Sequence, residues 1–147
     1  MNVLDAGIYS LLAADSGAGG VATLATGGIF QLSVPQGTIP PYVLFEELID
    51  NPNYNFGNVN SCDYIPYAFR AFTIDDVNAS SPVSGPFQAG RLADRFRALF
   101  SNPSISVSGK SVISCRMLRS IPPSKEKDET GSRWIYSRGA LVEMWVV

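Results

Sequence analysis

The sequence predicts a single α+β domain over residues 1–147, with a mixed four- or five-stranded sheet packed against two main helices. Two segments, Val3–Ala14 and Gly85–Ser101, repeat apolar residues at the spacing of an amphipathic helix. Elsewhere, runs rich in aromatic and β-branched residues are separated by clusters of Pro, Gly and Asn, which predicts strands joined by turns. A chain of 147 residues is long enough to bury a core of its own, and we find no repeat or second domain in its sequence.

The first predicted helix, Val3–Ala14, follows Asn2, a residue type that often caps helix N-termini, and Gly17 is placed to end it. One apolar stripe along this helix predicts its buried face. The stripe consists of Leu4, Ile8, Leu11 and Leu12. The glycine-rich stretch after the helix predicts a loop, and Val21–Ala25 is long enough for one more helical turn.

The next segment combines two predicted strands, Gly28–Val34 and Tyr42–Ile49, with a stiff connection between them. Three prolines fix φ and remove backbone donors in this connection: Pro35, Pro40 and Pro41. Gly37 allows a positive φ that other residues avoid. The second strand is rich in aromatic and β-branched residues, so we expect it to be at least half buried.

The middle of the chain predicts a loop, a long strand and a linker. Asp50–Asp63 contains five asparagines, a proline and a glycine, which is typical of a loop. Tyr64–Asp75 carries apolar residues on both faces, which predicts a central strand covered on both faces. Arg70 interrupts the second face, so we expect part of that face to meet solvent or a polar partner. Asp76–Ser84 is rich in turn residues and predicts a linker.

The second helix is expected to have Ser84 as its cap and Pro86 in its first turn, and Pro103 lies just beyond its end. Its buried stripe is predicted to be Ala89, Leu92, Ala93, Phe96, Leu99 and Phe100. Its outer face is predicted to be Gln88, Arg91, Asp94, Arg95 and Arg97.

The last third of the chain predicts two strands, an exposed loop and a closing strand. The strands are expected at Ser104–Val107 and Ser111–Ile121. Pro122–Ser132 is dense in charge and predicts an exposed loop. Arg133–Val147 alternates apolar and polar residues as a strand does, with a break expected at Gly139.

The composition narrows the classes of function. The formal net charge is −2, which does not favour a protein that binds nucleic acid mainly by neutralising phosphates. The chain has no histidine, so it lacks the commonest general base and metal ligand. Only 16% of residues are charged, while eight Phe, six Tyr and two Trp are present. These aromatic residues predict either a surface made for a partner or a large aromatic core.

Cysteine usage and the N-terminus bear on the compartment. Cys62 and Cys115 are far apart, and we expect free thiols, although one disulfide is formally possible. The first residues lack the basic and apolar regions of a signal peptide. No apolar run reaches the roughly 18 residues of a membrane span, so no membrane partner is expected.

Motifs for enzyme chemistry are weak, so neither an enzyme nor a cofactor or metal site is predicted. Gly109-Lys110-Ser111 matches the end of a phosphate-binding loop, but Ser104 stands where that motif needs glycine. A hairpin turn explains these residues better. Glu46-Glu47 and Asp75-Asp76 are neighbours in predicted strands, where adjacent side chains point to opposite faces, so neither pair forms a carboxylate dyad.

Two charged groups are candidates for contacts with another subunit or with a partner protein. Arg91 and Arg95 lie one helical turn apart and form either a basic face toward an acidic neighbour or, as we favour, a solvated surface. The other group forms either a solvated loop or a hairpin tip that reaches a neighbouring subunit. It consists of Lys125, Glu126, Lys127, Asp128 and Glu129.

The order of elements resembles that of the phage tail terminators, the tail-completion proteins of long-tailed phages. The start of the chain is similar to the start of these proteins in the order of its elements: a helix, a Gly-rich loop, a strand, a Pro-Gln-Gly turn and a Pro-Tyr-Val strand. Tyr67–Phe72 followed by the helix Ala89–Phe100 is similar to the family's central strand and long helix. The last two strands are matched by Cys115-Arg116, Ile121-Pro122 and Trp134–Glu143. Arg138 stands where the family often has a histidine.

The resemblance implies a structural virion protein of the tail or neck, assembled in the host cytoplasm. Such proteins form a hexameric ring on the head-proximal end of the tail tube, where they end tube polymerisation and join tail to head. The implied partners are the tail tube protein and the head-completion or stopper protein, and double-stranded DNA passes through the ring. A mildly acidic ring would suit such a conduit, because a basic lumen would retain DNA.

Two other functions remain open at this point. One is another neck component, the head-completion or stopper protein itself. The other, from a different class, is a small ligand-binding protein or hydrolase. It would need carboxylates from separate segments to meet in one pocket with shifted pKa values. The candidates are Asp63, Asp75, Asp76 and Glu143.

Overall fold

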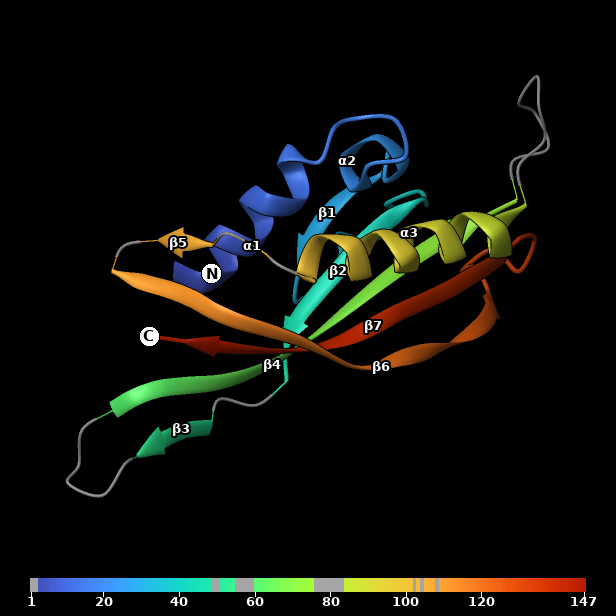
Figure 1. The fold of residues 1–147 in the computed structure, drawn as a ribbon. Helices are drawn as coiled ribbons and strands as arrows, with labels where there is room; N and C mark the ends of the chain where they lie inside the picture. The colour runs from blue at the N-terminus through green and yellow to red at the C-terminus, as the bar shows by residue number, and fades with distance from the viewer. Residues whose placement is uncertain are drawn as a thin grey trace.

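The computed structural model describes residues 3–48, 51–54, 60–75, 84–101, 103, 105–107 and 109–147. The fold has two layers, a strongly twisted sheet and a layer of helices that covers one of its faces (Figure 1). This arrangement is the single α+β domain that the sequence predicts.

Within the described residues, seven strands pair in the order β1-β2-β4-β7-β6-β5, with β3 beside β4. Five of them form the main sheet, while β3 pairs only with β4 and β5 only with the start of β6. The strands are β1 Gly28–Gln31, β2 Tyr42–Glu47, β3 Asn51–Tyr54, β4 Asn60–Ile74, β5 Ser106–Val107, β6 Lys110–Lys127 and β7 Trp134–Val146.

The sheet is mixed because β1 and β2 run parallel, with Gly28 paired to Tyr42, while every other pairing is antiparallel. Parallel neighbours need a crossover connection, and the proline-containing segment between them supplies it. Gly37 in this segment has φ of 83°, as the sequence predicts. The Pro40–Pro41 peptide bond is cis.

In the described chain, three helices lie on the same face of the sheet: α1 Val3–Ala14, α2 Val21–Leu24 and α3 Gly85–Phe100 (Figure 1). Phe69 of β4 lies in the core between the helices and the sheet. Its ring centroid is 5.7 Å from that of Phe96 and 4.4 Å from that of Phe100, both in α3. The predicted stripes of both helices are buried, apart from Leu11 and Leu99, which are partly buried against the same core.

Polar contacts fix two helix N-termini to β4 and its end. The phenol of Tyr67 donates a hydrogen bond of 2.7 Å to Oδ1 of Asp5, a carboxylate in the first turn of α1 that is only 2% exposed. At α3, the N–H of Gly85 donates to Oδ1 of Asp75 at 2.7 Å. Ser84 holds the predicted N-cap position, but its side chain makes no capping bond, so the end of β4 caps this helix instead. The expected cap Asn2 lies outside the described residues.

The predicted loop Asp50–Asp63 is partly wrong, since β3 and the start of β4 occupy its two ends. The asparagines and Pro52 are compatible with a strand here because β3 pairs only with β4, and an edge strand tolerates proline and weak β-formers.

The predicted loop Pro122–Ser132 is also partly wrong, because β6 continues to Lys127. The pairing of β6 with β7 shifts register between Ile121 and Ser124, so the two intervening prolines form an irregularity that needs no backbone donor. The predicted break at Gly139 is absent, since β7 continues through this residue. A Cβ at Gly139 would lie 2.0 Å from the carbonyl oxygen of Phe69, so the close approach of two strands explains the glycine.

The prediction that the central strand is covered on both faces is wrong for the described chain. Tyr67, Phe69 and Ala71 of β4 are fully buried beneath the helices. On the opposite face, Arg70 and Phe72 are only partly buried, and no described helix lies there. The apolar residues on both sides of β4 therefore serve two purposes, a core on one side and an open surface on the other.

Candidate functional site

Aromatic side chains gather on the face of the sheet that carries no helix, here called the helix-free face. Tyr42 lies between Phe72, whose ring centroid is 5.0 Å away and nearly parallel, and Phe30, 6.1 Å away and edge-on. Toward the other end of the sheet, Tyr64 lies against Trp145 with centroids 5.2 Å apart. All five are partly exposed, which is unusual for so many large rings on one surface of a monomer.

The charged side chains in the middle of the helix-free face are already paired. Arg70 Nη1 lies 2.8 Å from Glu46 Oε1, on adjacent strands. Arg116 Nε lies 3.0 Å from Glu143 Oε2, and the hydroxyl of Tyr64 donates to Glu143 Oε1 at 2.7 Å. The hydrogen bond to the Glu143 carboxylate, with a smaller contribution from burial, raises the pKa of Tyr64. These pairs leave few unsatisfied charges if the face is covered by another molecule.

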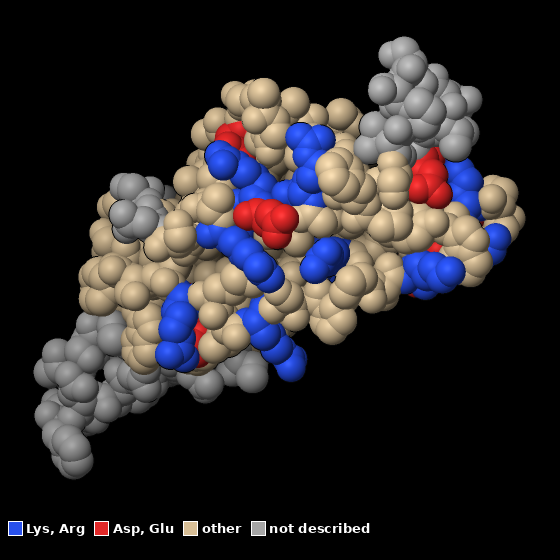
Figure 2. Space-filling view, turned by 45° about the vertical axis from the view of Figure 1, so that its right-hand side comes forward, with Lys and Arg blue, Asp and Glu red and all other residues tan. Residues whose placement is uncertain are grey.

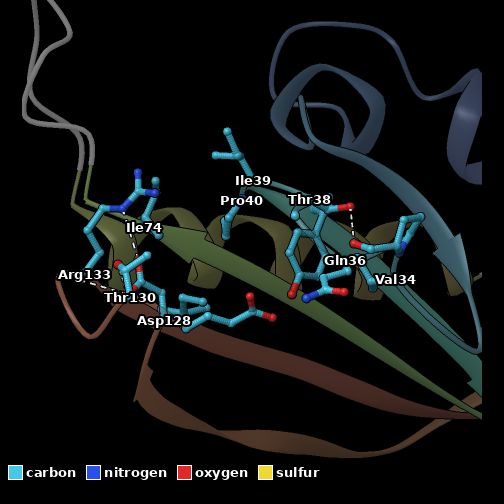
Figure 3. A pocket seen from close by; sticks show the side chains of 14 residues that line it. Val34, Gln36, Thr38, Ile39, Pro40, Ile74, Asp128, Thr130 and Arg133 are labelled. Atoms are coloured by element: carbon cyan, nitrogen blue, oxygen red, sulfur yellow. Dashed lines mark hydrogen bonds and ion pairs between the residues drawn. The ribbon is translucent and has the colours of Figure 1, made fainter.

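A cleft of about 300 Å³ lies at one end of the helix-free face (Figure 3). Its floor is formed by Tyr42 and apolar side chains of β4 and β7, and one wall by the crossover segment, including Ile39. The tip of the β6–β7 hairpin forms the other wall and contributes Asp128 and Arg133, which form an ion pair with Nε and Oδ2 3.3 Å apart. The hydrogen bond from the hydroxyl of Thr130, together with backbone bonds in the tip, lowers the pKa of Asp128. The cleft extends the open face into a concave end.

The structure separates the candidate interface residues that the sequence places in one charged run. Lys125 and Lys127 lie on the helix-covered side, with their Nζ atoms 4.7 Å and 4.4 Å from the centroid of the Trp134 ring. Glu126 pairs in register with Ile135 and faces the opposite side of the sheet. Asp128 and Glu129 belong to the hairpin tip and line the cleft.

The two candidate arginines of α3 have different roles. Arg95 makes two hydrogen bonds to the carboxylate of Asp15, at 2.8 Å and 2.6 Å, and thereby ties α3 to the loop after α1. The hydrogen bond from Arg95 lowers the pKa of Asp15 despite partial burial. Arg91 makes no ion pair within the described residues, and its guanidinium lies 6.0 Å from the centroid of the Phe87 ring. Arg95 is thus a structural residue, and Arg91 belongs to an open surface.

The carboxylates considered for a hydrolase do not meet where they are described. Asp75 follows the end of β4 and Glu143 pairs with Pro66 in the same strand, so along the strand they are about 30 Å apart. The side chain of Asp63 and all of Asp76 lie outside the described residues. In the described chain, no group of three or more His, Cys, Asp or Glu side chains could hold a metal ion.

Cys115 is a free thiol in β6, and burial raises its pKa to about 12. The side chain of Cys62 lies outside the described residues, so its state stays a prediction.

Sequence reasoning missed the helix-free face as a whole, although Arg70 pointed to a polar element on it. The signal that could have found it is the alternation of Tyr42, Leu44 and Glu46 in β2, which predicts one face different from the core. What the sequence could not supply was the position of all three helices on the other side.

None of the described helices is long and apolar enough to cross a membrane. Comparison of the chain with protein-family models and with curated proteins finds no match.

Proposed function

We propose that this chain is a structural subunit of a phage tail-terminator ring, in which copies associate through the helix-free face. The ring caps the head-proximal end of the tail tube, ends tube polymerisation and joins the tail to the head. In this proposal the protein is a virion component, assembled in the host cytoplasm as a hexamer, and acts through its interfaces rather than through a reaction. The order of sequence elements described above supports the family, and the mixed sheet with two main helices is compatible with it.

The observation that carries the proposal is the helix-free face with its partly exposed aromatic rings and paired charges. With a strand spacing of about 4.8 Å and a rise of about 3.4 Å per residue, the five strands of the main sheet present roughly 900 Å². A stable interface takes about 800 Å² from each partner, so the face is large enough for one neighbouring subunit. The ion pairs of Arg70 and Arg116 lower the cost of covering the middle of the face, and the exposed Arg119 of β6 would need an acidic partner on the neighbouring subunit.

A second copy of this chain is the occupant that we favour. A ring requires a head-to-tail contact, in which one surface meets a different surface of the next copy. The cleft at the end of the face provides a concave region for such a contact, and exposed apolar side chains occur elsewhere on the described chain. They include Leu32 and Ile113, which are 64% and 61% exposed.

The test is to delete this gene from a phage that carries it and to examine lysates of the deletion mutant by electron microscopy. Overlong tail tubes that fail to join DNA-filled heads would support the tail-terminator function. Tails of normal length that fail to join heads would replace it with the head-completion or stopper function. Intact infectious particles would refute both structural functions.

Complementation then tests the surface. Leu141 of β7 pairs with Ala68 of β4 and Arg119 of β6 and is partly buried on the helix-free face. Leu141→Glu places a charge there, and we expect it to leave tails overlong while the protein stays folded. Phe87→Glu is the matched control, since it adds the same charge to an exposed apolar residue of α3. Normal tails from the Leu141 variant, or equal defects from both variants, would refute the assignment of this face.

A further inference from the structure

Five cations lie on the helix-covered side of the molecule and are here called the cation strip. It consists of Arg91 and Arg97 of α3, Arg138 of β7, and Lys125 and Lys127 of β6. Arg97 Nη2 donates to the hydroxyl of Ser120 on β6, so this arginine spans from the helix to the sheet. A Cβ at Gly90 would lie 3.4 Å from Arg138 Nη1, which places that guanidinium against α3.

The cations of the strip outnumber its acids, although the exposed carboxylate of Asp94 lies between Arg91 and Arg97, three residues from each along α3. Within the described residues, none of its five members makes an ion pair. Of the nearby carboxylates, Asp15 is bound by Arg95, and Asp75 accepts from Gly85 and from Tyr136. Lys and Arg side chains gather across the middle of the visible surface and outnumber Asp and Glu there (Figure 2). Five of the eleven Lys and Arg residues of the chain therefore belong to this strip.

Cations of the strip lie near the two aromatic rings beside it, Phe87 and Trp134, which remain 64% and 40% exposed. Arg91 lies over Phe87, and both lysines lie over Trp134 at 4.7 Å and 4.4 Å from the ring centroid. Cations therefore lie beside every apolar ring of the strip, whereas the core of a protein–protein interface is poor in charge. A strongly positive, polar surface of this kind is typical of contacts with nucleic acid.

The strip is long and narrow, as a linear polyanion requires. Along β7, the distance from Trp134, beside the two lysines, to Ala140, which pairs with Ser120, is about 20 Å. Duplex DNA carries one charge for about every 1.7 Å of its axis, so this length faces roughly twelve phosphate charges. Guanidinium groups bind phosphate oxygens in a planar, bidentate geometry, and three of the five cations are arginines.

We propose that the cation strip binds the phosphates of duplex DNA without reading its sequence. This inference goes beyond the proposed function and does not depend on it, because the strip lies on the side opposite the helix-free face. Both surfaces are therefore available to one subunit at the same time. If the strip faces the lumen of a ring, it would slow DNA passage, in contrast to the mildly acidic conduit that the net charge suggests.

The test is fluorescence anisotropy of the purified chain with a labelled duplex of about 20 base pairs, at a series of salt concentrations. We expect binding that weakens about 150- to 500-fold between about 50 mM and 200 mM NaCl, because four to five phosphates are neutralised. The variant Arg91→Gln/Arg97→Gln/Arg138→Gln should bind at least about 10-fold more weakly and reduce the salt slope by about 3.

The control variant, Arg70→Gln/Arg119→Gln/Arg133→Gln, has the same net charge but leaves the strip intact, and it should bind nearly as the unaltered chain does. Circular dichroism confirms that both variants are folded. No binding at low salt, binding that does not depend on salt, or equal weakening by both variants would overturn the proposal. Binding of polyglutamate without binding of duplex DNA would also overturn it and assign the strip to an acidic protein. None of these outcomes depends on tail assembly, so they are separate from the test of the ring.

Discussion

Replacing the two phenylalanines of β4 one at a time tests the difference between the two faces of the sheet. Phe69 is fully buried beneath α3 and is surrounded by Phe45, Phe96 and Phe100. Phe72 lies three residues further on the same strand, stacks on Tyr42 and is only partly buried on the helix-free face. The two sites share the strand and the residue type, so their difference reports on their surroundings.

The expected costs follow from burial. A buried aromatic side chain removes about 150–250 Å² from water, at about 25 cal/mol per Å², and truncation also leaves a cavity. Phe69→Ala should therefore lower the free energy of unfolding by about 4 kcal/mol. Phe72→Ala removes partly exposed surface and leaves no enclosed cavity, so we expect a loss of about 1–2 kcal/mol. For a domain of this size, Phe69→Ala should lower Tm by about 12 °C, and Phe72→Ala by at most about 6 °C.

Urea unfolding followed by circular dichroism measures both losses, with an unchanged slope required for a valid comparison. Equal losses at the two sites would refute the assignment of Phe72 to an open face. Repeating the measurement at two protein concentrations adds a second readout. If copies associate through the helix-free face, the unaltered chain becomes more stable at higher concentration, and Phe72→Ala should remove part of that increase.

Three further predictions concern single sites. Gly139→Ala should destabilise the fold by about 2 kcal/mol, since its Cβ would clash with a backbone carbonyl, whereas Gly17→Ala, with no atom within 4 Å, should be nearly neutral in the same urea assay. The lowered pKa of Asp15 means that its bond to Arg95 stabilises the fold above about pH 4 and that this stabilisation is lost on acidification, so Asp15→Asn should flatten the acid limb of a stability–pH curve. Cys115, with its pKa near 12, should resist alkylation at pH 8 until the chain unfolds, as peptide mass spectrometry would reveal; rapid native labelling would contradict its burial.

The elements with strong local signals were predictable from the sequence. Helical spacing predicted α1 and α3 nearly to the residue, since a buried stripe along a helix needs only one partner surface. The proline-rich crossover and the turn at Gly109 were also predictable, because proline fixes φ and glycine allows positive φ whatever the rest of the fold does. The errors lay in strands at the edges of pairings, where Pro52 and Pro122 read as loop residues. Whether a proline interrupts a strand depends on which neighbour the strand has, and that is a tertiary fact.

The candidate site shows the same division. The sequence by itself predicted one α+β domain that is 11% aromatic and only 16% charged, because composition and periodicity are properties of the chain alone. Only the tertiary structure decided that all three helices lie on one face, which leaves Tyr42 and Phe72 uncovered on the other. It also decided that Arg91, Arg138 and Lys127, distant in the chain, share one side, since strand pairing places residues together by register rather than by sequence.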